Sequence, residues 1–213
     1  LVLTHPHPDH LNGLLFLVRN FEVGEFWESG INDGNRSYLT LKKLLRERGV
    51  PIRRIDASSR PIALDGVLIE PLSPPRSAVV AGTARSGTLN ETSLVFRLRC
   101  GEFSVLFTGD IGRNTEKRLA EESEGLHCTI LKVPHHGSRS SSSEPFLAVT
   151  SPQSALISAG YGNYFRLPAE ATLARLRRHG IPVYRTDLDG TVTITLDSGS
   201  WSVTTFRRNR HFR

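Results

Sequence analysis

The sequence of 213 residues contains no methionine and begins with Leu1. Translation starts with Met, and removal of that Met normally requires a small second residue, which Leu is not. We therefore expect this chain to be a fragment of a longer protein, whose targeting signals and membrane segments cannot be read from it. Long apolar runs are also missing, since the longest, Leu14 to Val18, is far below the roughly 18–20 residues that cross a bilayer.

Cysteine is scarce, because only Cys100 and Cys128 occur. Each lies in or beside an apolar run of the strand type. This placement favours two small core residues over a disulfide or a metal-binding pair, and it does not indicate a redox compartment.

Lysine is scarce as well: the 27 basic residues include four Lys, and the rest are Arg. The net charge is +6 and the pI about 9.8. Arg forms bidentate contacts with phosphate, although codon bias in a GC-rich genome explains this composition equally well. The charge fits a polyanionic partner and argues against a cationic one. A basic tail at about 207–213 is predicted to be disordered, with nucleic-acid contact as the alternative.

Strand and helix patterns alternate along the chain without an internal repeat. Apolar spacing predicts helices over 11–20, 37–49, 111–123 and 168–180, each ended by a loop or a glycine. Strands are predicted between them, with hairpins at Asp65-Gly66, at 101–102 and at 197–200, and loops over 73–90 and 135–147. The pattern indicates one α/β layered domain with mixed sheets over residues 1–213.

The segment THPHPDH, residues 4–10, places His5, His7, Asp9 and His10 within six positions. In an extended segment residues 5 and 7 point the same way, and the following turn brings residues 9 and 10 around. Imidazole nitrogen suits Zn, Fe and Mn, and a carboxylate favours harder ions. The alternative is a His/Pro-rich loop that arose by chance, but four such residues so close together favour a metal site serving two neighbouring positions.

Two later segments supply further candidates at predicted strand ends. Asp110 ends the segment Thr108-Gly109-Asp110, where a turn Asp is the ordinary alternative. His135 and His136 follow an apolar run, and one of them can bind metal while the other faces substrate; a polar loop is the alternative. Functional residues of α/β folds collect at strand ends.

These segments together resemble the metallo-β-lactamase fold, and more narrowly the C-terminal domain of ComEC-type DNA-internalisation proteins of natural competence. The resemblance runs over nearly the whole chain. It is carried by HxHxDH and by four strings, NETSLVFRL (90–98), LFTGDI (106–111), LKVPHHGS (131–138) and VYRTDLDGTVTI (183–194). It implies an αββα sandwich of two mixed sheets that lacks its first N-terminal strands here, and two divalent metal ions, Zn or Mn.

The resemblance also assigns roles to the candidate metal ligands. It implies that His5 and His7 hold a first ion, that Asp9 and His10 hold a second, and that Asp110 bridges them.

The resemblance assigns the paired histidines different roles. His135 would complete the second site, while His136 would lie near the scissile group and act in catalysis with Asp9. Many relatives supply another His before the bridging Asp, where this chain offers Asn90 and Ser93. The first site is therefore expected to be weaker, or completed by water or substrate.

A second departure concerns residues 161–168, where family members often carry a His and this chain has none. Ser138, Asn163 and Arg166 are the candidate substrate contacts, through phosphate.

Two metal ions lower the pKa of a bridging water and neutralise charge on a phosphoryl oxygen. The expected function is therefore a metal-dependent nuclease that cleaves DNA during uptake, without a small organic cofactor. The alternatives are another hydrolase on the same fold, a phosphodiesterase or thioesterase, and a non-catalytic DNA-binding or gating domain. The resemblance implies DNA and a membrane channel portion of the parent protein as partners, with the domain tethered to the inner membrane and facing the periplasm.

Overall fold

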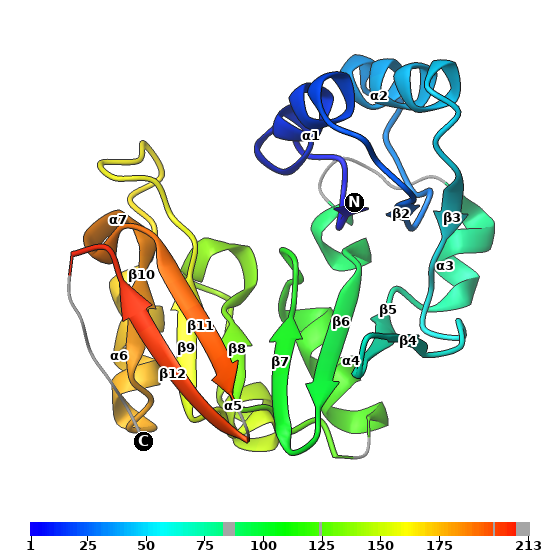
Figure 1. Ribbon diagram of the computed structural model, residues 1–213. Helices are drawn as coiled ribbons and strands as arrows, with labels where there is room; N and C mark the ends of the chain where they lie inside the picture. The colour runs from blue at the N-terminus through cyan, green and yellow to red at the C-terminus, as the bar shows by residue number, and fades with distance from the viewer. Residues whose placement is uncertain (83–87, 124, 198, 208–213) are drawn as a thin grey trace.

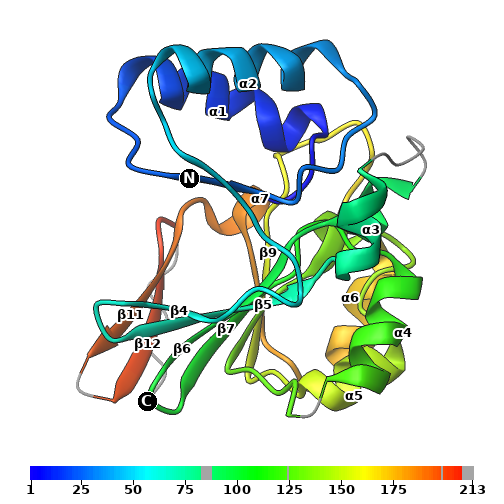
Figure 2. The ribbon, with the colours of Figure 1, turned by 90° about the vertical axis from the view of Figure 1, so that its right-hand side faces the viewer.

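The computed structural model describes the chain except residues 83–87, 124, 198 and 208–213. Two β-sheets pack against each other, and helices cover the outer face of each (Figures 1 and 2). This is the αββα arrangement that the sequence predicted. Most of the predicted basic tail lies outside the described residues.

The smaller sheet comes from the first quarter of the chain. Its order is β1-β2-β3, with β1 at Val2–Leu3, β2 at Phe26–Glu28 and β3 at Ile52–Arg54. All its pairings are parallel, whereas the sequence predicted a mixed sheet here. Two helices cover it, α1 at Pro8–Asn20 and α2 at Arg36–Glu47.

Local sequence explains where both helices begin. Pro8 is the first residue of α1, where the fixed proline φ suits a helix and the missing N–H costs nothing. Asn35 caps α2 by accepting a hydrogen bond from the Tyr38 N–H at 2.9 Å. The apolar faces of both helices then pack over β2 in a core that contains Leu11, Leu41 and other buried side chains.

The larger sheet has seven strands in the order β10-β9-β8-β7-β6-β5-β4. Strands β7 to β10 run parallel, and β4 to β7 are antiparallel neighbours, so this sheet is mixed. The strands are β4 (Ile62–Leu64), β5 (Val67–Ser73), β6 (Val95–Cys100), β7 (Phe103–Phe107), β8 (Ile130–Lys132), β9 (Ser154–Ile157) and β10 (Val183–Arg185).

Helices α4 (Arg113–Glu122), α5 (Glu144–Thr150) and α6 (Glu170–Arg178) cover the outer face of the larger sheet (Figure 2). Its inner face meets the smaller sheet, where the rings of Trp27 and Phe96 lie 6.2 Å apart between centroids. A hairpin of β11 (Val192–Asp197) and β12 (Ser200–Thr205) contacts the large sheet through Trp201 and Phe103.

Short helices occupy two segments that the sequence predicted as loops. Helix α3 (Arg76–Ala81) lies within 73–90, and α5 lies within 135–147. Helix α3 follows Pro75 and helix α5 follows Ser143. Both helices are too short to show helical periodicity in the sequence. Short turns η2 (Asn90–Thr92), η3 (Pro134–Gly137) and α7 (Thr186–Asp189) complete the fold. None of the helices in the described ranges has the length and apolarity that a membrane crossing requires.

Candidate metal centre

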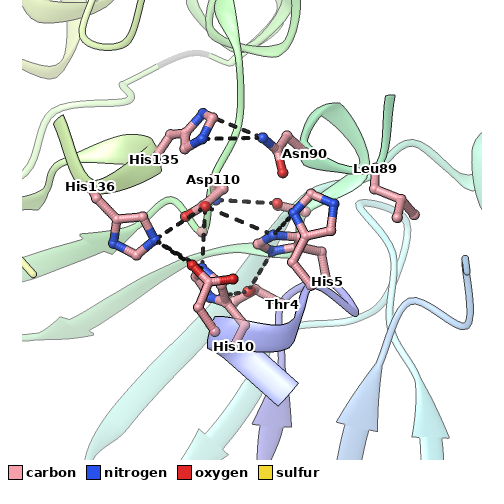
Figure 3. Close-up of polar contacts among 12 residues, drawn as sticks. Thr4, His5, His10, Leu89, Asn90, Asp110, His135 and His136 are labelled. Carbon is pink, nitrogen blue, oxygen red and sulfur yellow. Dashed lines mark hydrogen bonds and ion pairs between the residues drawn. The ribbon is translucent and has the colours of Figure 1, made fainter. Parts of the chain in front are cut away.

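Three segments far apart in sequence meet at one edge of the sandwich. Residues 4–10 follow β1 and enter α1, Asp110 follows β7, and the turn η3 follows β8. All three strands belong to parallel pairs, so the segments emerge at the carboxyl ends of strands, where α/β folds collect functional residues. Figure 3 shows their side chains pointing toward one another.

Four of the predicted residues form one compact group. The ligand atoms of Asp9, His10, Asp110 and His136 all lie within 4.8 Å of one another. Oδ2 of Asp110 is 3.2 Å from Nε2 of His10 and 3.4 Å from Nε2 of His136. Oδ2 of Asp9 lies 3.2 Å from Nε2 of His136. We call these residues the four-residue group.

His5 and His7 form a pair beside this group. Nε2 of His5 lies 3.1 Å from Nδ1 of His7 and 3.9 Å from Oδ2 of Asp110. His5 is buried, with 1% of its surface exposed, whereas His7 is half-buried. Within this pair, His5 is the member that also approaches Asp110 of the four-residue group.

His135 and His136 point in different directions. Their rings lie 6.3 Å apart between centroids at an interplanar angle of 73°. The sequence assigned the metal role to His135, but the structure places His136 in the four-residue group and sets His135 against Asn90. The Asn90 Nδ2 donates toward Nδ1 of His135 at 3.3 Å. The structure thus brings His136 and not His135 to Asp9, His10 and Asp110, while the roles assigned to the two histidines stay a prediction.

The backbone accounts for this divergence. His135 and His136 both adopt positive φ, 46° and 52°, a conformation that costs roughly 1–2 kcal/mol for a residue with a side chain. Such local strain persists only where the surrounding structure fixes it, and it clusters at functional sites. Here the His135 N–H donates to the Gly109 carbonyl at 3.2 Å, which ties η3 to the residue before Asp110.

Burial and hydrogen bonds shift the pKa values of residues in and beside the four-residue group. Burial alone would raise the pKa of Asp110, but the hydrogen bonds from His10 and His136 outweigh it and hold this pKa well below its usual range. Burial, with the neighbouring His10, lowers the pKa of His5 to about 3. The bond to Asp110 raises the pKa of His136, whereas burial lowers that of His135. An ionised Asp110 and a neutral His5 are the forms that ligate metal.

The group fits a divalent cation in two respects. Nε2 of His10 and Nε2 of His136 lie 3.2 Å apart, and two nitrogens on one tetrahedral ion with bonds of about 2.0–2.1 Å would be about 3.3 Å apart. In addition, Oδ1 of Asp110 is buried and has no hydrogen-bond partner among the described residues. A buried carboxylate oxygen normally has a partner, so this atom is free to bind an ion.

The three predicted substrate contacts, Ser138, Asn163 and Arg166, differ in their exposure and hydrogen bonding. The Ser138 hydroxyl is buried without a hydrogen-bond partner in the described chain. The Asn163 amide is engaged within its own loop, donating to the Gly160 and Leu167 carbonyls at 2.9 and 2.6 Å. Arg166 is exposed. Only Arg166 therefore presents its polar side chain to solvent.

Two supporting residues were missed from the sequence. The Thr4 hydroxyl lies 3.2 Å from Nδ1 of His5 and 3.5 Å from Nδ1 of His10, and its position directly before the first His was the available signal. The Ser158 carbonyl accepts a hydrogen bond from Nδ1 of His136 at 2.8 Å, which turns Nε2 toward the group. A backbone carbonyl leaves no signal in the sequence. Ser93, noted at first only as a departure, accepts from the Asp110 N–H at 3.2 Å.

The fold and the site together define a class. The sequence pattern of the Metallo-beta-lactamase superfamily matches residues 1–161, and the chain belongs to this superfamily. A crystal structure from Parabacteroides distasonis ATCC 8503, provisionally assigned as a metal-dependent hydrolase, superposes with a TM-score of 0.51 over 88% of this chain and 75% of that one. At 15% identity this likeness concerns the fold alone.

Curated relatives narrow the class. ComE operon protein 3 of Bacillus subtilis (strain 168) is 31% identical over 195 residues, covering 90% of this chain and 24% of that protein. Competence protein ComA of Neisseria gonorrhoeae is 40% identical over 111 residues, covering 52% of this chain and 16% of that protein. The resemblance to ComEC-type competence proteins is confirmed. The chain spans about a quarter or less of the length of these relatives.

Proposed function

We propose that this chain is a metal-dependent nuclease domain that cleaves DNA phosphodiester bonds during DNA uptake. The observation that carries the proposal is the four-residue group with its buried Asp110, whose Oδ1 lacks a partner among the described residues. Four converging ligands on a fold of this superfamily support a hydrolytic centre more directly than a structural ion pair does.

Two divalent ions are part of the proposal. Asp9, His10, Asp110 and His136 would hold one, and His5, His7 and Asp110 the other. Bound ions of this kind lower the pKa of a coordinated water and neutralise charge on a phosphoryl oxygen.

The protein side chains prepare these sites. The low pKa of His5 keeps its imidazole neutral at physiological pH, and the Ser158 carbonyl fixes the tautomer of His136 by accepting from Nδ1. Asn90 leaves His135 pointing away from the four-residue group, where it is available to contact the substrate.

DNA is the proposed substrate because two independent observations agree. The chain carries a net charge of +6, which favours a polyanion. The relatives named above are competence proteins, ComE operon protein 3 and ComA. By the same likeness, we propose that the domain belongs to a larger polytopic protein of the inner membrane, faces the periplasm, and works beside the membrane channel portion of that protein.

The test measures metal content and DNA cleavage on the same preparation. We expect elemental analysis to find two ions per chain after loading with Mn or Zn, and labelled single- and double-stranded DNA to be cut only by the loaded protein. Uncut DNA in the presence of confirmed metal would refute the nuclease. Cleavage of a thioester or of a non-nucleic phosphodiester in place of DNA would then favour another hydrolase, and zero or one ion with DNA binding would favour a gating domain.

A further inference from the structure

A loop beside the metal centre carries an unusual concentration of exposed aromatic side chains. Residues 160–168, here called the aromatic loop, connect the end of β9 to α6 and rise past the edge of the large sheet (Figure 1). The exposed fractions are 83% for Tyr161, 92% for Tyr164 and 77% for Phe165. Each of these side chains keeps a large apolar area in water, which a fold does not require.

The loop is held in shape from within. The Asn163 side chain donates to the carbonyls of Gly160 and Leu167 and accepts from the Leu167 N–H at 2.9 Å. The Arg166 N–H donates to the Asn163 carbonyl at 3.0 Å. The rings of Tyr164 and Phe165 contact each other edge to face, 5.6 Å apart between centroids. A preformed loop loses little conformational entropy when a ligand binds to it.

Both ends of the loop are fastened to the metal centre. Just before the loop, the Ser158 carbonyl accepts from Nδ1 of His136 at 2.8 Å. Just after it, the Ala169 N–H donates to the Gly137 carbonyl at 2.8 Å, and Pro168 packs so closely that a Cβ on Gly137 would lie 2.6 Å from it. The loop is therefore anchored at both ends to the turn that carries His136.

The single positive charge of the aromatic loop favours an anionic ligand. Arg166 is its only charged residue, and no acidic residue lies between 158 and 169. The hollow beside the loop is also lined by Arg185 and Asp187, which neutralise each other at 2.6 Å. Aromatic faces with one free cation suit an anionic chain with exposed planar groups.

We propose that the aromatic loop binds unpaired nucleotides by stacking bases on Tyr161, Tyr164 and Phe165, with Arg166 on the phosphate. This inference rests on the proposed nuclease function and gives it a substrate form, single-stranded DNA or a frayed strand end. Aromatic side chains stack on any base and so bind without sequence preference. In an intact duplex the base faces are already stacked on one another, so no base face is free to stack on the aromatic side chains of the loop.

The test measures binding without cleavage, so that its result does not depend on the nuclease. The full chain in EDTA is titrated into a fluorescently labelled oligo-dT of 20 nucleotides, and fluorescence anisotropy gives the Kd. The variant Tyr161→Ala/Tyr164→Ala/Phe165→Ala should bind at least about tenfold more weakly. Tyr161→Phe/Tyr164→Phe/Phe165→Tyr, which keeps the rings, should stay within about threefold of the wild type.

The matched control is Phe21→Ala. Phe21 is 55% exposed and follows the last residue of α1, while the first turn of α1 carries Asp9 and His10. The rise of a helix places Phe21 about 17 Å from these two residues. We expect the control to bind oligo-dT like the wild type, and a blunt DNA duplex of two fully paired strands to bind equally to all of these variants.

Two further readouts separate stacking from other roles. A 2-aminopurine in the oligonucleotide should lose fluorescence on binding the wild type but not the triple alanine variant. Arg166→Ala should reduce the slope of log Kd against log salt by about 0.7, the value for one phosphate contact on a single strand.

If the triple alanine variant binds oligo-dT with the Kd of the wild type, the proposal is wrong. It is also wrong if this variant loses binding to phosphatidylglycerol vesicles with unchanged oligo-dT binding, which would make the loop a membrane contact. If the metal-loaded protein fails to cut DNA while the stacking results hold, the nuclease fails and the binding loop stands.

Discussion

Nε2 of His10 lies 3.2 Å from Oδ2 of Asp110, and the two residues belong to different halves of the sandwich. His10 is in the first turn of α1, which packs on the smaller sheet, whereas Asp110 follows β7 of the larger one. The metal centre therefore joins the two halves of the fold. An ion bound there would stabilise their packing as well as supply chemistry, because binding free energy adds to folding free energy.

The first prediction concerns Asp110→Asn. This change removes the charge that both His10 and His136 contact. We expect metal content to fall, hydrolysis of DNA to drop by at least about a hundredfold, and the rise in Tm on metal loading to disappear. Elemental analysis, a gel assay and a thermal melt measure these effects.

The matched control is Asp65→Asn. Asp65 is exposed in the turn between β4 and β5 and has a φ of 46°, which Asn tolerates. It should leave metal content, activity and Tm at wild-type values. Equal metal content in Asp110→Asn and Asp65→Asn would contradict the assignment of Asp110.

The second prediction separates the paired histidines. His136→Ala should remove the ion of the four-residue group, because Nε2 of His136 lies within 3.4 Å of both Asp9 and Asp110. His135→Ala should leave metal content unchanged and reduce DNA cleavage through the substrate. Metal stoichiometry and cleavage rate are measured on both variants. The opposite pattern, with metal lost only from His135→Ala, would restore the roles that sequence resemblance assigned.

Much of this architecture could be predicted from sequence because its signals are local. Helix α2 carries apolar residues at helical spacing and an Asn cap, and the hairpin of β6 and β7 alternates around Gly101. The first four site residues share one short segment, and Asp110 follows an apolar strand. Each of these features follows from residues near one another in the chain.

The remainder depends on tertiary contacts. Nothing in the pair His135-His136 tells which ring approaches Asp110, because the left-handed backbone at both residues depends on the contact of η3 with Gly109. Likewise, Asn163 was predicted as a phosphate contact, but its amide is used by the carbonyls of its own loop. Helix α5 lacks a periodic signal because it spans only seven residues.

The third prediction concerns Gly109→Ala. Gly109 has a φ of 52°, and a Cβ there would lie 2.8 Å from Cβ of Ser93 and 3.2 Å from Cβ of Thr4. The clash must displace Asp110 or the two residues that support it. We expect a loss of roughly 1–3 kcal/mol in the free energy of unfolding, together with weaker metal binding.

Gly101→Ala is the control for backbone strain alone. Gly101 has a φ of 57°, and nothing lies within 4 Å of its would-be Cβ. Urea denaturation and metal titration should show a smaller stability loss and unchanged metal affinity for this variant. If the two variants behave alike, the close approach at Gly109 does not position the site.

The fourth prediction concerns the Cys128 thiol and pH. Burial raises the pKa of Cys128 from 9.0 to about 12, and only 4% of its surface is exposed. In a Cys100→Ser background, iodoacetamide at pH 8 should therefore modify Cys128 only after unfolding in urea. Labelling of the native protein at the rate of a free thiol would show that the site opens or that the thiol ionises.

The same shift has a consequence for stability, and its sign follows from proton linkage. Below pH 9 the thiol is protonated in both states and contributes nothing. Between about pH 9 and 12 the unfolded chain ionises while the folded chain cannot, so the free energy of unfolding falls by up to about 1.4 kcal/mol per pH unit. Cys128→Ala should lack this component. Urea denaturation of both proteins from pH 8 to 10.5 isolates it, since every other titrating group contributes equally to the pair.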